Sequence, residues 1–185
     1  MKRFVVFVGI LLTLSMLSLA QERMTFKGVS FDNTVENFAN ELEKKGFKEV
    51  GREGNTIFME GPFLNENRYV GIIATERSNL VYMVNIMLDV HENWSSLKGE
   101  YESIKELYEK KYGKGDSTEK FLSSGDKMRA VWKEECEYFT RFATKTGGVV
   151  VGITNTELPY HGLVMVMYMD TRNSEKNEAE NLEDI

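Results

Sequence analysis

Apolar residues recur at helical spacing in two segments of the chain. In Thr34–Lys45 they fall at positions i, i+3, i+4 and i+7, namely Val35, Phe38, Ala39 and Leu42. In Ser95–Lys111 they form a second stripe, which continues to the residue before Gly113: Leu97, Tyr101, Ile104, Tyr108 and Tyr112. Residues three and four apart share one side of a helix. The pattern therefore predicts two helices, the first with a capping box formed by Asn33 and Glu36.

Between and after these segments the apolar pattern changes to a period of two, which is typical of β-strands. The predicted strands are Thr56–Gly61, Arg68–Thr75, Leu80–Val90, Lys127–Lys133, Cys136–Lys145, Val149–Thr154 and Leu163–Asp170. Short connections separate them, including a two-residue hairpin at Gly147-Gly148. Such neighbours must pair antiparallel, because parallel strands need long crossover connections.

The order of elements predicts an α+β fold in which two helices pack on a mainly antiparallel sheet. Two helix-plus-meander halves are an alternative description, because Glu41–Gly46 resembles Glu106–Lys111. That likeness has a simpler origin, since lysine pairs are favoured at the end of any helix. We expect one α+β domain over residues 21–172, followed by a disordered acidic tail over residues 173–185, which lacks aromatic residues.

The first 20 residues have a separate pattern. Lys2 and Arg3 precede an uncharged, mostly apolar run, Phe4–Ala20, that ends in Ser18-Leu19-Ala20. A basic start, an apolar middle and small residues before the exit are the signs of a secretory signal peptide. The alternative is an uncleaved membrane anchor, for which the run is short. We expect cleavage after Ala20 and a periplasmic or secreted mature protein without a membrane span.

Composition narrows the classes of function. The net charge of −6 argues against a nucleic-acid partner, because such proteins carry a basic surface. The single cysteine excludes an internal disulfide framework and a cysteine-rich zinc site. That residue, Cys136, lies among three glutamates, which would raise its pKa and make it a poor nucleophile.

Metal and acid–base chemistry have few candidates in this sequence. His91 and His161 are its only histidines. A metal site or a hydrolase site could combine either histidine with acidic residues such as Asp89 and Glu92, although on an extended strand Glu92 points away from Asp89 and His91. The simpler interpretation is a polar strand end. No catalytic residue, metal ligand or cofactor is assigned.

Methionines form a third candidate site. Met165, Met167 and Met169 share one side of the last predicted strand, because residues two apart point the same way. Three thioethers could bind Cu(I), a soft ion that prefers sulfur ligands. Packing under a helix is the more ordinary role of such residues, and Met83 and Met87 could share that role.

One stretch resembles a known group of proteins. Phe26-Lys27-Gly28-Val29, Phe38, Leu42, Gly46-Phe47 and Gly61-Pro62-Phe63 resemble the opening of small exported proteins of unknown function from gut anaerobic bacteria. The resemblance covers about forty residues, 26 to 63. It implies an envelope protein with helices and a sheet, and it carries no assigned site residues.

These observations favour a non-catalytic binding module over an enzyme. We expect a protein or glycan partner to meet either one face of the sheet or the loops Gly61–Asn67 and Asn155–Gly162. The alternatives are an envelope hydrolase or metal-dependent enzyme that uses His91 or His161, and copper binding by the methionine strand. The oligomeric state is not predicted.

Overall fold

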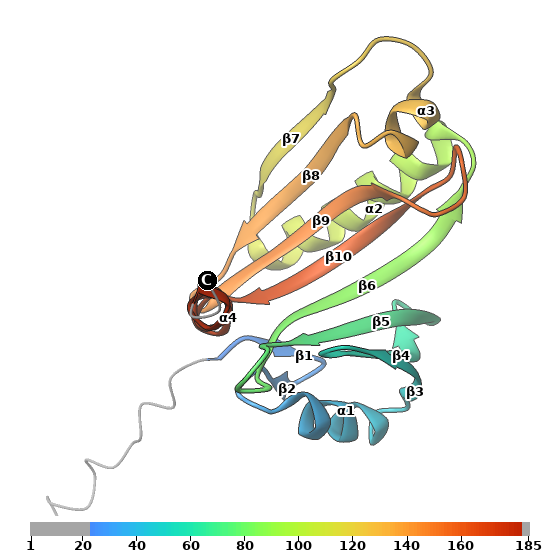
Figure 1. The fold of residues 1–185 in the computed structure, drawn as a ribbon. Coiled ribbons are helices and arrows are strands. Elements are labelled where there is room, and N and C mark those ends of the chain that lie inside the picture. Colours follow the sequence, from blue (N-terminus) through green and yellow to red (C-terminus); the bar gives the residue numbers. More distant parts are fainter. Residues whose placement is uncertain (1–22, 183–185) are drawn as a thin grey trace, which may run out of the picture.

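A computed structural model describes residues 23–182, which form a mostly β structure (Figure 1). The main sheet has eight antiparallel strands in the order β3-β4-β5-β6-β10-β9-β8-β7. Their bounds are β3 Lys48–Glu53, β4 Thr56–Phe63, β5 Glu66–Ala74, β6 Val81–His91, β7 Asp116–Phe121, β8 Cys136–Ala143, β9 Gly147–Asn155 and β10 Gly162–Asp170. A small second sheet pairs β1 (Thr25–Phe26) with β2 (Val29–Ser30).

Four helices accompany the sheets within the described residues: α1 Val35–Glu43, α2 Trp94–Tyr112, α3 Lys127–Trp132 and α4 Thr171–Leu182. The predicted fold class, two helices on a sheet, is therefore wrong, because the structure has ten strands and twice as many helices. The prediction of antiparallel pairing is confirmed. No helix in the described part of the chain is long and apolar enough to cross a membrane.

The strand order shows how the chain builds the main sheet. Strands β3–β6 run as one meander and β7–β10 as a second, and the two meet where β6 pairs with β10. Helix α1 precedes the first meander and packs against it, whereas α2 precedes the second and packs on β6, β8, β9 and β10. In Figure 1, α2 lies behind the second meander, so the opposite side of these strands faces the viewer.

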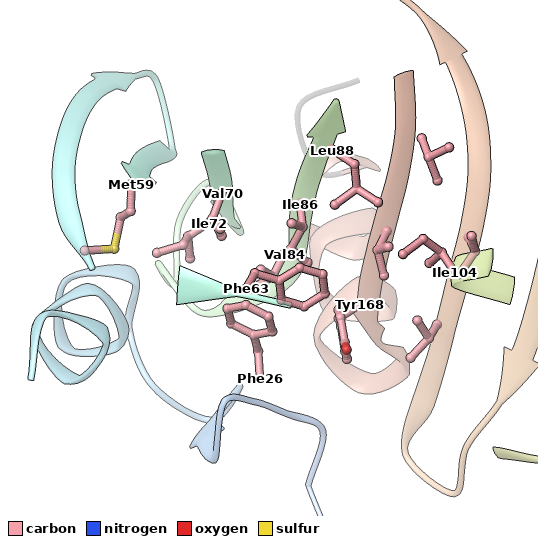
Figure 2. Packing of buried hydrophobic residues seen from close by; sticks show 14 of the residues in the cluster. Phe26, Met59, Phe63, Val70, Ile72, Val84, Ile86, Leu88, Ile104 and Tyr168 are labelled. Carbon is pink, nitrogen blue, oxygen red and sulfur yellow. The ribbon is translucent and has the colours of Figure 1, made fainter. Parts of the chain in front are cut away.

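One apolar core lies between the helices and the sheet. The predicted stripes are buried in it, since Phe38 and Leu42 of α1 and Leu97 and Tyr101 of α2 are each 0% exposed. Figure 2 shows that strands of both meanders contribute to this core. Phe26 from β1 packs against Tyr168 from β10, with ring centroids 5.3 Å apart. The two meanders therefore share one core.

Several local predictions need correction. Lys127–Lys133 was expected as a strand, but α3 forms there because the Asp126 side chain accepts a hydrogen bond from the backbone N–H of Arg129 at 2.7 Å. The hairpin expected at Gly147-Gly148 turns earlier, at residues 144–146, and both glycines belong to β9. Thr34, rather than Asn33, is the residue that caps α1.

The long strand β6 departs from its predicted single apolar face. The register of its pairing with β5 shifts between Ile73 and Ala74. The register of its pairing with β10 shifts between Leu163 and Met165. Such irregularities rotate a strand, so residues beyond them change face. As a result Val90, which strict alternation along Leu80–Val90 would place with the buried Val84 and Ile86, is 51% exposed.

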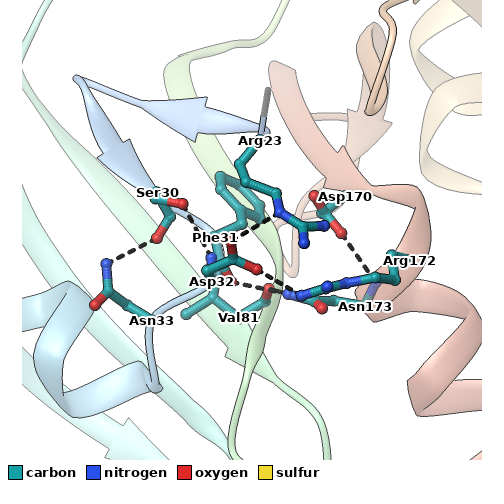
Figure 3. A network of polar contacts seen from close by, with 9 residues as sticks. All are labelled: Arg23, Ser30, Phe31, Asp32, Asn33, Val81, Asp170, Arg172 and Asn173. Carbon is teal, nitrogen blue, oxygen red and sulfur yellow. Dashed lines mark hydrogen bonds and ion pairs between the residues drawn. The ribbon is translucent and has the colours of Figure 1, made fainter. Parts of the chain in front are cut away.

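The acidic tail differs from its predicted disorder. Residues 171–182 form α4, which lies across the ends of β6, β9 and β10 (Figure 1). Asn173 fixes this helix, because its Nδ2 donates hydrogen bonds to the carbonyl oxygens of Phe31 and Val81, both at 2.8 Å (Figure 3). The predicted signal peptide, residues 1–20, lies outside the described residues.

Candidate functional site

One face of the main sheet has no helix packed over its centre in the described structure. Burial alternates along the middle of β6 and along most of β10. In β6 the residues Val84 and Ile86 are fully buried under the helices, whereas the residues between them are only partly buried. We call this second side the open face. Its central residues are Phe58, Tyr69, Ile73, Met83, Asn85, Met87, Phe139, Val150, Met165, Met167 and Met169.

Methionines occupy the middle of the open face. The register places Met87 of β6 directly opposite Met165 of β10, and Met83 opposite Met169. Met167 lies between these pairs, opposite Asn85. Five flexible thioether side chains are thus gathered from two strands that are far apart in the sequence. Each group of methionines is visible in the sequence, but their meeting is not, because the sequence does not show the strand order.

Asn85 is the polar centre of this apolar surface. Its Oδ1 atom is buried and has no hydrogen-bond partner among the described residues. Its register neighbours are Gly71 on β5 and Met167 on β10, neither of which offers a side-chain donor. A buried acceptor without a partner is costly.

Two shallow clefts hollow the open face. One, of about 450 Å³, lies over β8, β9 and β10 and is lined by Phe139, Val150 and the three methionines of β10. The other, of about 530 Å³, is lined by Met87, Met165, Leu163 and residues of the β9–β10 loop. The charged side chains of the first cleft lie towards β7 and β8, where Glu137 is paired with Lys120 at 2.9 Å and Arg141 lies over the Phe139 ring.

The histidines do not assemble the predicted metal site. His91 contacts Glu100 of α2, with Nε2 and Oε2 3.1 Å apart, and His161 Nδ1 contacts the carbonyl oxygen of Pro159 at 2.8 Å. Asp89 pairs instead with Arg68. No group of three histidine, cysteine or acidic side chains suited to a metal ion occurs within residues 23–182. Neither histidine lines a cleft of the open face.

Cys136 begins β8 and is partly buried. Burial raises the pKa of its thiol to about 11. The direction agrees with the sequence analysis, but the main cause is loss of solvent rather than the neighbouring glutamates. The thiol is therefore protonated at neutral pH and is a weak nucleophile.

The two predicted binding loops lie in different places. The Asn155–Gly162 segment borders the open face, and its exposed Tyr160 packs against Trp132 with ring centroids 5.1 Å apart. The Gly61–Asn67 segment is mostly strand, with a turn at Leu64 and Asn65. Phe63 and Leu64 line a pocket that also includes residues of α2.

Comparisons with protein-family models, with curated proteins and with solved structures give no match. The proposals that follow rest on the chemistry and geometry of this chain alone.

Proposed function

We propose that this protein is an exported, non-catalytic binding module that holds a protein partner on its open face. The observation that carries the proposal is the two cross-strand methionine pairs of β6 and β10, Met83 with Met169 and Met87 with Met165. They lie on a sheet surface over whose centre no helix packs within the described residues. Exposed apolar patches of this kind mark interaction sites. Methionine suits such a site because its side chain adapts to differently shaped surfaces.

A protein partner fits the open face better than a glycan does. Sugar binding needs many polar groups to match the hydroxyls, and the centre of this face offers the amide of Asn85 among thioether and hydrocarbon groups. An apolar protein surface matches that arrangement. The aromatic pair Trp132 and Tyr160 is the better candidate for stacking on a sugar, but it lies outside this centre.

The test compares envelope proteins retained by the purified protein and by two variants. Met167→Glu places a charge in the middle of the open face, and we expect it to abolish retention of the partner. Leu122→Glu is the matched control, because Leu122 is 58% exposed and follows β7, away from the methionines. Equal retention by both variants, with unchanged thermal unfolding, would overturn the proposal.

Cu(I) binding is a second candidate function, favoured by the same cross-strand methionine pairs. Thioethers are soft ligands that select Cu(I). Metal analysis and Cu(I) titration of the purified protein, with and without Met167→Leu, would test it. Stoichiometric copper that is lost on substitution is the expected result, and the absence of bound copper in the unsubstituted protein would exclude this function.

A further inference from the structure

A pocket opens on the helix side of the main sheet, where the two meanders meet. Its volume is about 380 Å³, which lies in the range of small-molecule sites. Four rings from four different elements form much of its wall: Phe26 of β1, Phe63 of β4, Tyr108 of α2 and Tyr168 of β10. We call it the aromatic pocket. Three of these residues, Phe26, Phe63 and Tyr168, lie close together in Figure 2.

Two lysines line the aromatic pocket. Lys27 lies over the Phe63 ring, 5.6 Å from its centroid, and Lys111 lies over the Tyr112 ring at 4.8 Å. Neither forms an ion pair with a described residue, and no carboxylate lines the pocket. Although the chain as a whole has a net charge of −6, two ammonium groups without a nearby carboxylate at one opening favour a negatively charged ligand there.

Two of the ring residues that line the pocket, Tyr108 and Tyr168, also carry hydroxyl groups. The hydroxyl oxygens of Tyr108 and Tyr168 are buried and 2.5 Å apart. Each hydroxyl has one proton, and their mutual hydrogen bond uses only one of the two. The other proton has no acceptor among the described residues. Burial raises the pKa of Tyr168 to about 12 and raises that of Tyr108 as well, so both phenols remain donors at neutral pH.

We propose that the aromatic pocket binds a small amphipathic carboxylate. The hydrocarbon part of the ligand packs against the four rings. Its carboxylate lies beside Lys27 and Lys111 and accepts the spare proton of the Tyr108–Tyr168 pair. Because the pocket and the open face lie on opposite sides of the sheet, this proposal does not depend on the proposed function.

Calorimetric titration with octanoate, 3-phenylpropanoate and 1-octanol tests the proposal. We expect saturable binding of both carboxylates, with octanoate bound more tightly than the uncharged alcohol of equal chain length. Binding of octanoate should weaken as salt is raised, because salt screens the exposed lysines. The carboxylates should also raise the unfolding temperature, because they bind the folded state.

Charge variants then locate the site. Lys27→Met and Lys111→Met should each weaken octanoate binding by about threefold, the size expected of an exposed ion pair, and leave 1-octanol unaffected. Lys110→Met is the matched control, because Lys110 does not line the pocket and pairs with Glu106 at 2.8 Å. Leu107, 46% exposed at the pocket, gives an opposed pair: Leu107→Lys should strengthen octanoate binding and Leu107→Glu should weaken it.

Three results would overturn the proposal. They are no saturable binding of either carboxylate to the unsubstituted protein, equal affinity for octanoate and 1-octanol, and an effect of Lys110→Met as large as that of the pocket lysines. Thermal unfolding of each variant confirms that a lost signal reflects the pocket rather than loss of the fold.

Discussion

Asn173 connects three distant parts of the chain through one side chain. Its Nδ2 donates to backbone oxygens of Phe31, just before α1, and of Val81, at the start of β6. Its own backbone N–H donates to the Asp170 carboxylate at 2.9 Å. The side chain is 1% exposed, so water cannot replace these bonds.

Replacing Asn173 with alanine should destabilise the protein by about 1–3 kcal/mol, because two buried carbonyl oxygens would lose their donor. Chemical denaturation measures this change. Asn181→Ala is the control, because Asn181 belongs to the same helix but is exposed, and it should change stability by less than about 0.5 kcal/mol. Equal effects of the two substitutions would contradict the role given to Asn173.

Glu180 makes the attachment of α4 dependent on pH. Its carboxylate accepts hydrogen bonds from the Ser78 hydroxyl and from the backbone N–H groups of Arg77 and Ser78, which together lower its pKa below the ordinary value. A lowered folded-state pKa stabilises the structure at neutral pH. That contribution is lost as the pH falls through the ordinary pKa and then through the lowered one.

We therefore expect hydrogen exchange in residues 171–182 to speed up, relative to the rest of the chain, as the pH is lowered from about 7 to about 3. Rates corrected for intrinsic exchange are the measurement. In Glu180→Gln the pH-dependent step should disappear. If the step kept the same size in that variant, the pH dependence would come from a titratable group other than Glu180.

The residue scale also shows where sequence reasoning stops. The composition of residues 173–185 predicts disorder, and two residues that tie α4 to the body, Asn173 and Glu180, look like ordinary surface residues in the sequence. Their partners are 92 or more residues away in the chain. No local pattern reports such contacts. The same holds for Asn85, whose position at the centre of the open face follows from strand pairing alone.

At the scale of elements, two glycines have opposite surroundings. Gly61 was expected in a turn but lies inside β4, where an added Cβ would be 2.3 Å from the Phe47 ring and 2.8 Å from its Cα. Gly99 lies in α2 and has open space at the corresponding position. The close approach at Gly61 lets the chain entering β3 cross directly over β4.

Gly61→Ala should destabilise the protein by about 1–3 kcal/mol through overpacking, whereas Gly99→Ala should stabilise it by about 0.5–1 kcal/mol through helix propensity. Thermal unfolding of the two variants measures both changes: the unfolding temperature should fall in Gly61→Ala and rise in Gly99→Ala. A neutral result for Gly61→Ala would mean that Phe47 can move aside.

Elements with a clear apolar period were predictable and short polar ones were not. The stripes of α1 and α2 and the apolar runs of β4, β5, β8, β9 and β10 were visible in the sequence. β3 was missed, and Asp116–Asp126, which contains β7, was interpreted as a loop or a poor strand. Both are edge strands whose residues are mostly exposed, so burial leaves no alternating pattern in them. α3 was misread because its six residues are too short to distinguish the two periods.

At the scale of the whole molecule, the pairing of β6 with β10 joins the two meanders into one sheet over one core. We expect a single cooperative unfolding transition, because neither half can separate without exposing the contact between Phe26 and Tyr168. Calorimetry tests this expectation by comparing the van't Hoff and calorimetric enthalpies. Two resolved transitions would show that the halves unfold independently.

The edge strands β3 and β7 limit how this molecule can associate with others. Charged side chains occupy most positions of β3, where Arg52 pairs with Glu49 at 2.6 Å, and half of the positions of β7. A neighbouring chain that added a strand at either margin would have to desolvate these charges. The sheet is thereby protected against edge-to-edge growth into fibrils, although its open face stays available for binding.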